Sequence, residues 1–124
     1  MNVQEKHELT NLALGLYIHV PFCSSTCDFC AFYQEKPRKN SIKNYLSALR
    51  LEFMRVLPLR SVDTVFVGGG TPGVLSARQM VELCEIVRQA GGNFSEWSVE
   101  LAPSEVTEEK LKVLKDFGVT RISL

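Results

Sequence analysis

Residues 14–30, Leu-Gly-Leu-Tyr-Ile-His-Val-Pro-Phe-Cys-Ser-Ser-Thr-Cys-Asp-Phe-Cys, join an apolar run to a cluster of cysteines. The run over residues 14–20 predicts a β-strand, which the following proline ends. The loop after this strand carries Cys23, Cys27 and Cys30. Thiolates at this spacing suit an iron–sulfur cluster, and three of them leave one iron of a four-iron cluster free to bind a small molecule.

Further strands alternate with helices along the rest of the chain. We expect helices over residues 40–57, 76–90 and 107–117, and strands over residues 62–67, 97–101 and 119–124. Ser76 and Gln79 match a capping box, Thr107 caps the last helix, and Gly118 ends it. This order predicts an α/β fold with a parallel sheet and crossover helices, either doubly wound or part of a barrel.

The length of 124 residues suits one domain. We assign residues 1–13 to an N-terminal extension and residues 14–124 to a core domain that stops within its fourth strand. A parallel strand at the end of the chain would be an exposed apolar edge. We therefore expect this chain to be the N-terminal piece of a longer protein, and a longer reading frame to be more soluble.

The 14 basic and 14 acidic residues cancel, which gives no electrostatic reason to bind nucleic acid or an anionic membrane. The longest apolar run is too short and too broken to span a bilayer, and no secretory signal begins the chain. We expect a cytoplasmic protein, in which closely spaced cysteines bind metal more often than they form disulfides.

A structural zinc site is the alternative from another class, and it needs a fourth ligand. The candidates are Cys84 and His19. Cys84 lies on the apolar face of the second predicted helix, which favours a buried thiol. His19 lies within the first predicted strand, which favours a histidine satisfied by a hydrogen bond. Cys27 and Cys30 also have the spacing of a thioredoxin-like pair, although such a pair does not require Cys23.

The glycine-rich stretch at residues 68–73, Gly-Gly-Gly-Thr-Pro-Gly, formally matches the dinucleotide fingerprint G-x-G-x-x-G. The match is weak, because Pro72 intervenes and the helix begins only near Ser76. Two interpretations stay open. The backbone could approach a ligand with ammonium and carboxylate groups, or the glycines could form a tight strand-to-helix turn.

Glu100 is a carboxylate within the third predicted strand, where such a group is seldom buried without a partner. It could accept hydrogen bonds from two ribose hydroxyls, or it could pair with Arg121 on the next strand.

Together, the stretches Tyr17-Ile-His-Val-Pro-Phe-Cys-Ser-Ser-Thr-Cys-Asp-Phe-Cys, Val67-Gly-Gly-Gly-Thr-Pro-Gly, Ser98-Val-Glu and Val119-Thr-Arg-Ile-Ser-Leu resemble the radical S-adenosylmethionine superfamily. More narrowly, they resemble the oxygen-independent coproporphyrinogen III oxidase family and its heme-chaperone branch. The resemblance implies the N-terminal part of a partial (βα)6 barrel. It also implies that the three cysteines hold a [4Fe–4S] cluster whose fourth iron binds the methionine moiety of S-adenosylmethionine. Reductive cleavage of that cofactor then yields a 5′-deoxyadenosyl radical.

The resemblance also assigns cofactor contacts, residue by residue. Tyr17 would lie near the sulfonium, Gly69 would meet the methionine moiety, and Glu100 would meet the ribose. A second cofactor molecule would lie near Phe29, Gly70 and Thr71. No residue is assigned a catalytic role.

Two departures from the family pattern bear on function. The oxidases carry a further cysteine where this chain has Phe32. The family usually has an Asn or Asp two residues after the glutamate, where this chain has Ala102. Phe32 favours a heme chaperone that binds and delivers heme, with oxidation of coproporphyrinogen to protoporphyrinogen as the alternative. The implied partners are heme or a porphyrinogen, an electron donor of the flavodoxin or ferredoxin type, and a heme-recipient protein. Membrane association is left open, because nothing in the chain encodes it.

Overall fold

The computed structural model describes residues 2–3, 14–23, 36–56, 62–91 and 93–124. Their main elements are β1 (Gly15–Val20), α2 (Ser41–Val56), β2 (Thr64–Gly69), α3 (Ala77–Arg88), β3 (Glu96–Glu100), α4 (Glu108–Phe117) and β4 (Arg121–Ser123). Two short 3-10 helices, η2 (Pro72–Val74) and η3 (Pro103–Glu105), follow β2 and β3. The strands form one sheet in the order β1-β2-β3-β4, and every neighbouring pair is parallel. This confirms the predicted α/β fold with crossover helices.

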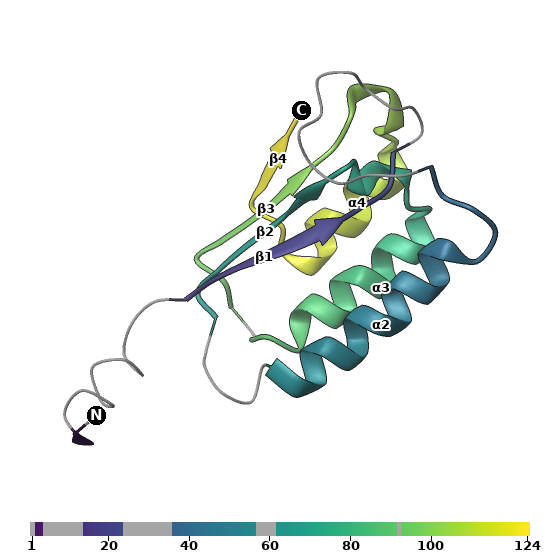
Figure 1. Cartoon of the computed structure of the whole chain (residues 1–124). Helices are drawn as coiled ribbons and strands as arrows, with labels where there is room; N and C mark the ends of the chain where they lie inside the picture. Colours follow the sequence, from purple (N-terminus) through teal and green to yellow (C-terminus); the bar gives the residue numbers. More distant parts are fainter. Residues whose placement is uncertain (1, 4–13, 24–35, 57–61, 92) are drawn as a thin grey trace.

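The three long helices cover one face of the sheet (Figure 1). Alternating strand residues point into this layer, because successive side chains in a strand leave opposite faces. Val65 and Val67 of β2 are buried, whereas Phe66 between them is 39% exposed. Among the described residues, the core therefore lies between the sheet and the helices, and the other face of the sheet is open. No described helix is both long and apolar enough to cross a lipid bilayer.

Local signals set the helix ends as predicted. The Ser76 hydroxyl accepts from the Gln79 amide, and the Gln79 side chain accepts from the Ser76 amide, which completes the capping box. The Thr107 hydroxyl caps α4 by accepting from the Lys110 amide. Gly118 then ends α4 in the left-handed region with a φ of 99°, where glycine is favoured because it has no Cβ.

The strand limits differ from the predicted ones. β2 continues to Gly69, because Gly68 and Gly69 pair with His19 and Val20 of β1. β4 is short and starts only at Arg121. The amide of Val119 is used to close α4 by donating to the Leu114 carbonyl, so this residue belongs to the helix cap and not to a strand. β3 starts one residue earlier than expected, at Glu96.

The 3-10 helices were not predicted. Each begins with a proline, Pro72 or Pro103, whose fixed φ suits the first helical position and whose missing N–H costs nothing there. The 3-10 helix η2 follows β2 and the 3-10 helix η3 follows β3, so both lie at the carboxyl edge of the sheet. The predicted helix end at residue 57 lies outside the described residues.

Candidate functional site

The carboxyl ends of the four strands meet at one edge of the sheet, which is where α/β folds bind ligands. A pocket of about 270 Å³ lies at this edge. It brings together four of the residues singled out in the sequence, namely Cys23, Gly70, Thr71 and Glu100. Its remaining lining residues are Leu101, Ala102, Ser123 and Leu124. Cys27, Phe29, Cys30 and Phe32 lie outside the described residues.

The glycine run packs against the backbone that leads into Cys23. The Gly70 amide donates to the Val20 carbonyl at 2.7 Å, and the Thr71 amide donates to the Phe22 carbonyl at 2.7 Å. A Cβ on Gly70 would overlap the carbonyl oxygen of Phe22. The close backbone approach anticipated from the glycines is therefore made here to the protein itself, as part of a tight strand-to-helix connection.

Gly69 is constrained differently from Gly70. Its φ of 114° lies in the region that L-residues avoid, and a Cβ there would stand 2.7 Å from the Val20 carbonyl oxygen and 2.8 Å from Nδ1 of His19. Gly69 is thus enclosed between the end of β1 and the His19 ring, beside the pocket residue Gly70.

The Tyr17 hydroxyl and Nδ1 of His19 share a hydrogen bond of 3.1 Å on the open face of the sheet. The Tyr45 hydroxyl, from α2, donates to the His19 backbone carbonyl at 2.6 Å. His19 is therefore hydrogen-bonded within its strand, as the sequence indicated. Partial burial, and secondly the Glu100 carboxylate, raise the pKa of Tyr17 above its ordinary value.

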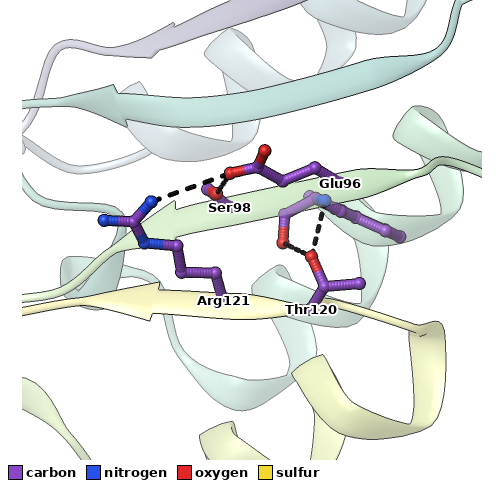
Figure 2. A network of polar contacts seen from close by, with 5 residues as sticks. Glu96, Ser98, Thr120 and Arg121 are labelled. Carbon is purple, nitrogen blue, oxygen red and sulfur yellow. Dashed lines mark hydrogen bonds and ion pairs between the residues drawn. The ribbon is translucent and has the colours of Figure 1, made fainter.

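Glu100 extends over Gly68, where a Cβ would stand 3.1 Å from the Glu100 carboxyl group. The alternative ion pair between Glu100 and Arg121 is wrong for the described residues. Arg121 instead lies 3.8 Å from Glu96, as Figure 2 shows. β4 places Arg121 opposite Ser98, two residues from both Glu96 and Glu100, and the Arg121 side chain extends toward Glu96.

The Arg121–Glu96 pair is solvent-exposed and contributes little to stability. The Ser98 hydroxyl also donates to the Glu96 carboxylate, at 3.0 Å. These contacts leave the Glu100 carboxylate as the acidic group that lines the pocket.

The Thr71 side chain is almost fully buried and joins two loops. Its hydroxyl accepts from the Ala102 amide at 3.1 Å and donates to the Glu105 carboxylate at 3.0 Å. The Lys110 ammonium donates to the carbonyls of Gly73 and Glu105, at 2.8 and 3.3 Å. Sequence reasoning missed Glu105 and Lys110, because no motif or periodicity marks them.

Cys84 is buried in the helix–sheet core, as predicted, and supplies no thiolate to the pocket. Burial raises the pKa of the Cys84 thiol to about 12, despite the opposing effect of Arg88. Cys84 therefore lies in the core and does not line the pocket that holds Cys23, so its position gives no support to its role as a fourth zinc ligand beside Cys23.

The donor set of the pocket suits the cofactors implied by the resemblance. Cys23, a half-buried cysteine that follows strand β1, lines the same pocket as Glu100. A soft thiolate is the ligand that iron–sulfur clusters require, and a carboxylate can accept from two ribose hydroxyls.

Comparison with known proteins adds three findings. The family model described as "Radical SAM superfamily" matches residues 17–124. A heme chaperone, HemW, of Bacillus subtilis is 35% identical over 113 residues, which is 86% of this chain and 30% of the relative. An oxygen-independent coproporphyrinogen III oxidase of Escherichia coli is 34% identical over 120 residues, covering 90% of this chain and 26% of the relative.

Among solved structures, the coproporphyrinogen III oxidase HemN from Escherichia coli, described as a radical SAM enzyme, superposes with a TM-score of 0.78 at 30% identity. The match covers 98% of this chain and 30% of that protein. The chain thus spans about 30% of the length of the curated heme chaperones it matches.

Proposed function

The chain belongs to the radical SAM superfamily, and from this premise we propose that it forms the cofactor-binding part of a radical S-adenosylmethionine protein of heme metabolism. The observation that carries the proposal is the pocket that joins Cys23, the first cysteine of the motif, to Glu100 across the carboxyl edge of the sheet. The family implies a [4Fe–4S] cluster and S-adenosylmethionine in general.

In this proposal, Cys23, Cys27 and Cys30 hold the cluster by three thiolates. When bound, the cluster and S-adenosylmethionine supply a one-electron cleavage that generates a 5′-deoxyadenosyl radical. Glu100 accepts hydrogen bonds from the ribose. Tyr17 would lie near the sulfonium of the cofactor, as the resemblance implies.

Gly69 meets the methionine moiety, and a second cofactor molecule lies near Phe29, Gly70 and Thr71. The amides of Gly70 and Thr71 already donate to Val20 and Phe22, so these two residues would contact a second cofactor through their other atoms.

We propose a heme chaperone that binds and delivers heme. The support is Phe32, which stands where the oxidases carry a further cysteine, together with the 35% identity to a heme chaperone. The second candidate is coproporphyrinogen oxidation, which the structural likeness to HemN favours. Heme or a porphyrinogen, an electron donor of the flavodoxin or ferredoxin type and a heme-recipient protein are the proposed partners, in the cytoplasm.

The test of the cofactor site is electron paramagnetic resonance on the anaerobically reconstituted, dithionite-reduced chain, with and without S-adenosylmethionine. We expect a reduced-cluster signal that shifts when S-adenosylmethionine is added. Cys23→Ser should lose the reduced-cluster signal. The matched control is Cys84→Ser, which changes a buried core thiol, and its folded fraction should keep the signal. A reconstituted protein that gives no paramagnetic resonance signal and contains one zinc ion per chain would contradict the radical mechanism.

An assay with coproporphyrinogen III, reductant and S-adenosylmethionine separates the two candidate functions. A heme chaperone should bind heme and form no decarboxylated product. Decarboxylated porphyrinogen formed over many turnovers would overturn the chaperone and establish the oxidase.

A further inference from the structure

Two loops line the same side of the pocket and touch each other away from it. The loop after β2 contributes Gly70 and Thr71 to the pocket, and the loop after β3 contributes Leu101 and Ala102, next to Glu100. Two of these pocket residues join the loops directly, because the Ala102 amide donates to the Thr71 hydroxyl, and further contacts behind the pocket hold that hydroxyl in place.

Glu105 is the residue where those contacts converge. Its carboxylate accepts from the buried Thr71 hydroxyl at 3.0 Å. That same hydroxyl accepts from the Ala102 amide at 3.1 Å, so its single proton is directed to Glu105 and its lone pair to Ala102. A hydrogen bond to a carboxylate is stronger than one between neutral groups.

A second tie joins the same loops. The Lys110 ammonium, from the first turn of α4, donates to the Gly73 carbonyl at 2.8 Å and to the Glu105 carbonyl at 3.3 Å. The loops are also closely packed here, because a Cβ on Gly73 would stand 2.8 Å from the Glu105 carboxylate and 3.3 Å from the Leu101 side chain.

The connection extends to the cysteine loop. The Thr71 amide donates to the carbonyl of Phe22, the residue before Cys23, at 2.7 Å. Thr71, on the loop after β2, is therefore hydrogen-bonded to the two other loops, those after β1 and β3, and Glu105 fixes the orientation of its side chain.

We infer that Glu105 is a positioning residue that acts through Thr71 to set the placement of Cys23 relative to Glu100 across the pocket. The expected effect of Glu105 on the affinity for S-adenosylmethionine rests on the proposed function. Glu105 does not line the pocket itself, so its effect on that affinity must pass through the loops.

The first measurement is amide hydrogen exchange on the chain without cofactors. In Glu105→Leu, the Ala102 amide should exchange at least about tenfold faster than in the parent, because the Thr71 hydroxyl is no longer held. Glu105→Gln keeps an acceptor oxygen and should restore protection. Glu109→Leu removes the same charge from the exposed first turn of α4 and should leave Ala102 unchanged. Unchanged exchange in Glu105→Leu would overturn the inference.

The second measurement is the S-adenosylmethionine-dependent shift of the reduced-cluster signal, titrated to give a dissociation constant. We expect Glu105→Leu to weaken binding about five- to tenfold, with iron content per chain unchanged and Glu105→Gln close to the parent. Faster exchange at Ala102 with unchanged affinity would make Glu105 merely structural and overturn its positioning role. If the parent itself shows no shift, the proposed function fails and the positioning role falls with it, which is a different pattern from failure of the variant alone.

Thr71 provides a second check, from the other end of the same hydrogen bond. Thr71→Val should reproduce the effect of Glu105→Leu on affinity, and Thr71→Ser should restore it. The double variant should bind no more weakly than either single one, because both substitutions break the same connection. Additive losses would mean that Glu105 does not act through Thr71, and would overturn the inference.

Discussion

At Gly70, the absence of a side chain lets two backbone segments approach each other. The Gly70 amide reaches the Val20 carbonyl, and the space a Cβ would need is taken by the Phe22 carbonyl. The neighbouring backbone cannot move away without shifting the loop that carries Cys23. Packing within the protein thus requires glycine at position 70, where a contact with a second cofactor molecule is also proposed.

Gly70→Ala should lower the free energy of unfolding by about 2–3 kcal/mol, because the added methyl overlaps a backbone carbonyl and no flexible side chain. The matched control is Gly91→Ala, whose methyl would meet its nearest atom at 3.4 Å, an ordinary contact distance. Urea unfolding of both variants measures the difference. Equal stabilities of the two variants would contradict the steric argument.

The Cys84 thiol predicts a pH dependence of stability. Its pKa is raised from 9.0 in the unfolded chain to about 12 in the folded one, chiefly by burial. The raised pKa stabilises the folded state below about pH 9, and this contribution is lost as the pH rises toward the folded-state value. Between about pH 8 and 10, the parent should therefore lose roughly 1 kcal/mol more stability than Cys84→Ala, measured by urea unfolding under reductant. Parallel pH profiles would show that this thiol does not titrate differently in the two states.

At the scale of secondary-structure elements, hydrogen bonds join the carboxyl ends of helices α3 and α4. Arg88, in the last turn of α3, donates from Nε and Nη2 to the Phe117 carbonyl at the end of α4, 3.0 Å from Nε. A cation at these carbonyls also complements the partial negative charge of the helix C-terminus. The amino end of α3 is held separately by its capping box.

Ser76→Ala should cost about 1 kcal/mol, because the Gln79 amide loses its acceptor at the first turn of α3. Ser76→Asn, which keeps a side-chain acceptor, should be close to the parent. Thermal unfolding of the three proteins checks this, and a fully stable alanine variant would show that the cap is dispensable.

For the whole molecule, the one-sided covering of the sheet determines which face is available to ligands. Helices α2, α3 and α4 pack on one face (Figure 1), while Tyr17 and Phe66 stack on the other with ring centroids 5.9 Å apart. Glu100 lies over Gly68 on this open face, beside the Phe66 ring. Among the described residues, Glu100 thus belongs to the face of the sheet that the helices leave uncovered, and it also lines the pocket at the carboxyl edge.

Adjacent residues of β2 test this arrangement. Val67→Ala should lower the free energy of unfolding by about 2 kcal/mol, because Val67 is 1% exposed between sheet and helices. Phe66→Ala removes more atoms but should cost about 1 kcal/mol or less, chiefly the stacking on Tyr17. Urea unfolding measures both, and the reverse order would mean that the open face is covered in solution.

The sequence by itself determined what depends on near neighbours along the chain. The alternation of strands and helices, the capping box at Ser76 and the glycine stop at Gly118 follow from periodicity and from contacts within a few residues. The burial of Cys84 was predictable because its neighbours place it on an apolar helix face. The family resemblance assigned Cys23, Gly70, Thr71 and Glu100 to the binding of cluster and cofactor, and the structure places these four residues around one pocket.

Only the tertiary structure decided which polar partners meet. Thr71 bonds to Ala102 and Glu105, 31 and 34 residues away, and no local pattern encodes that choice. Arg121 pairs with Glu96 and not with Glu100, although its register partner Ser98 lies two residues from each of them, so the direction of the Arg121 side chain decides the pair. The physical reason is that these contacts depend on how two elements pack against each other and on which way their side chains point. Helix and strand formation depends mainly on residues that are near one another in the sequence.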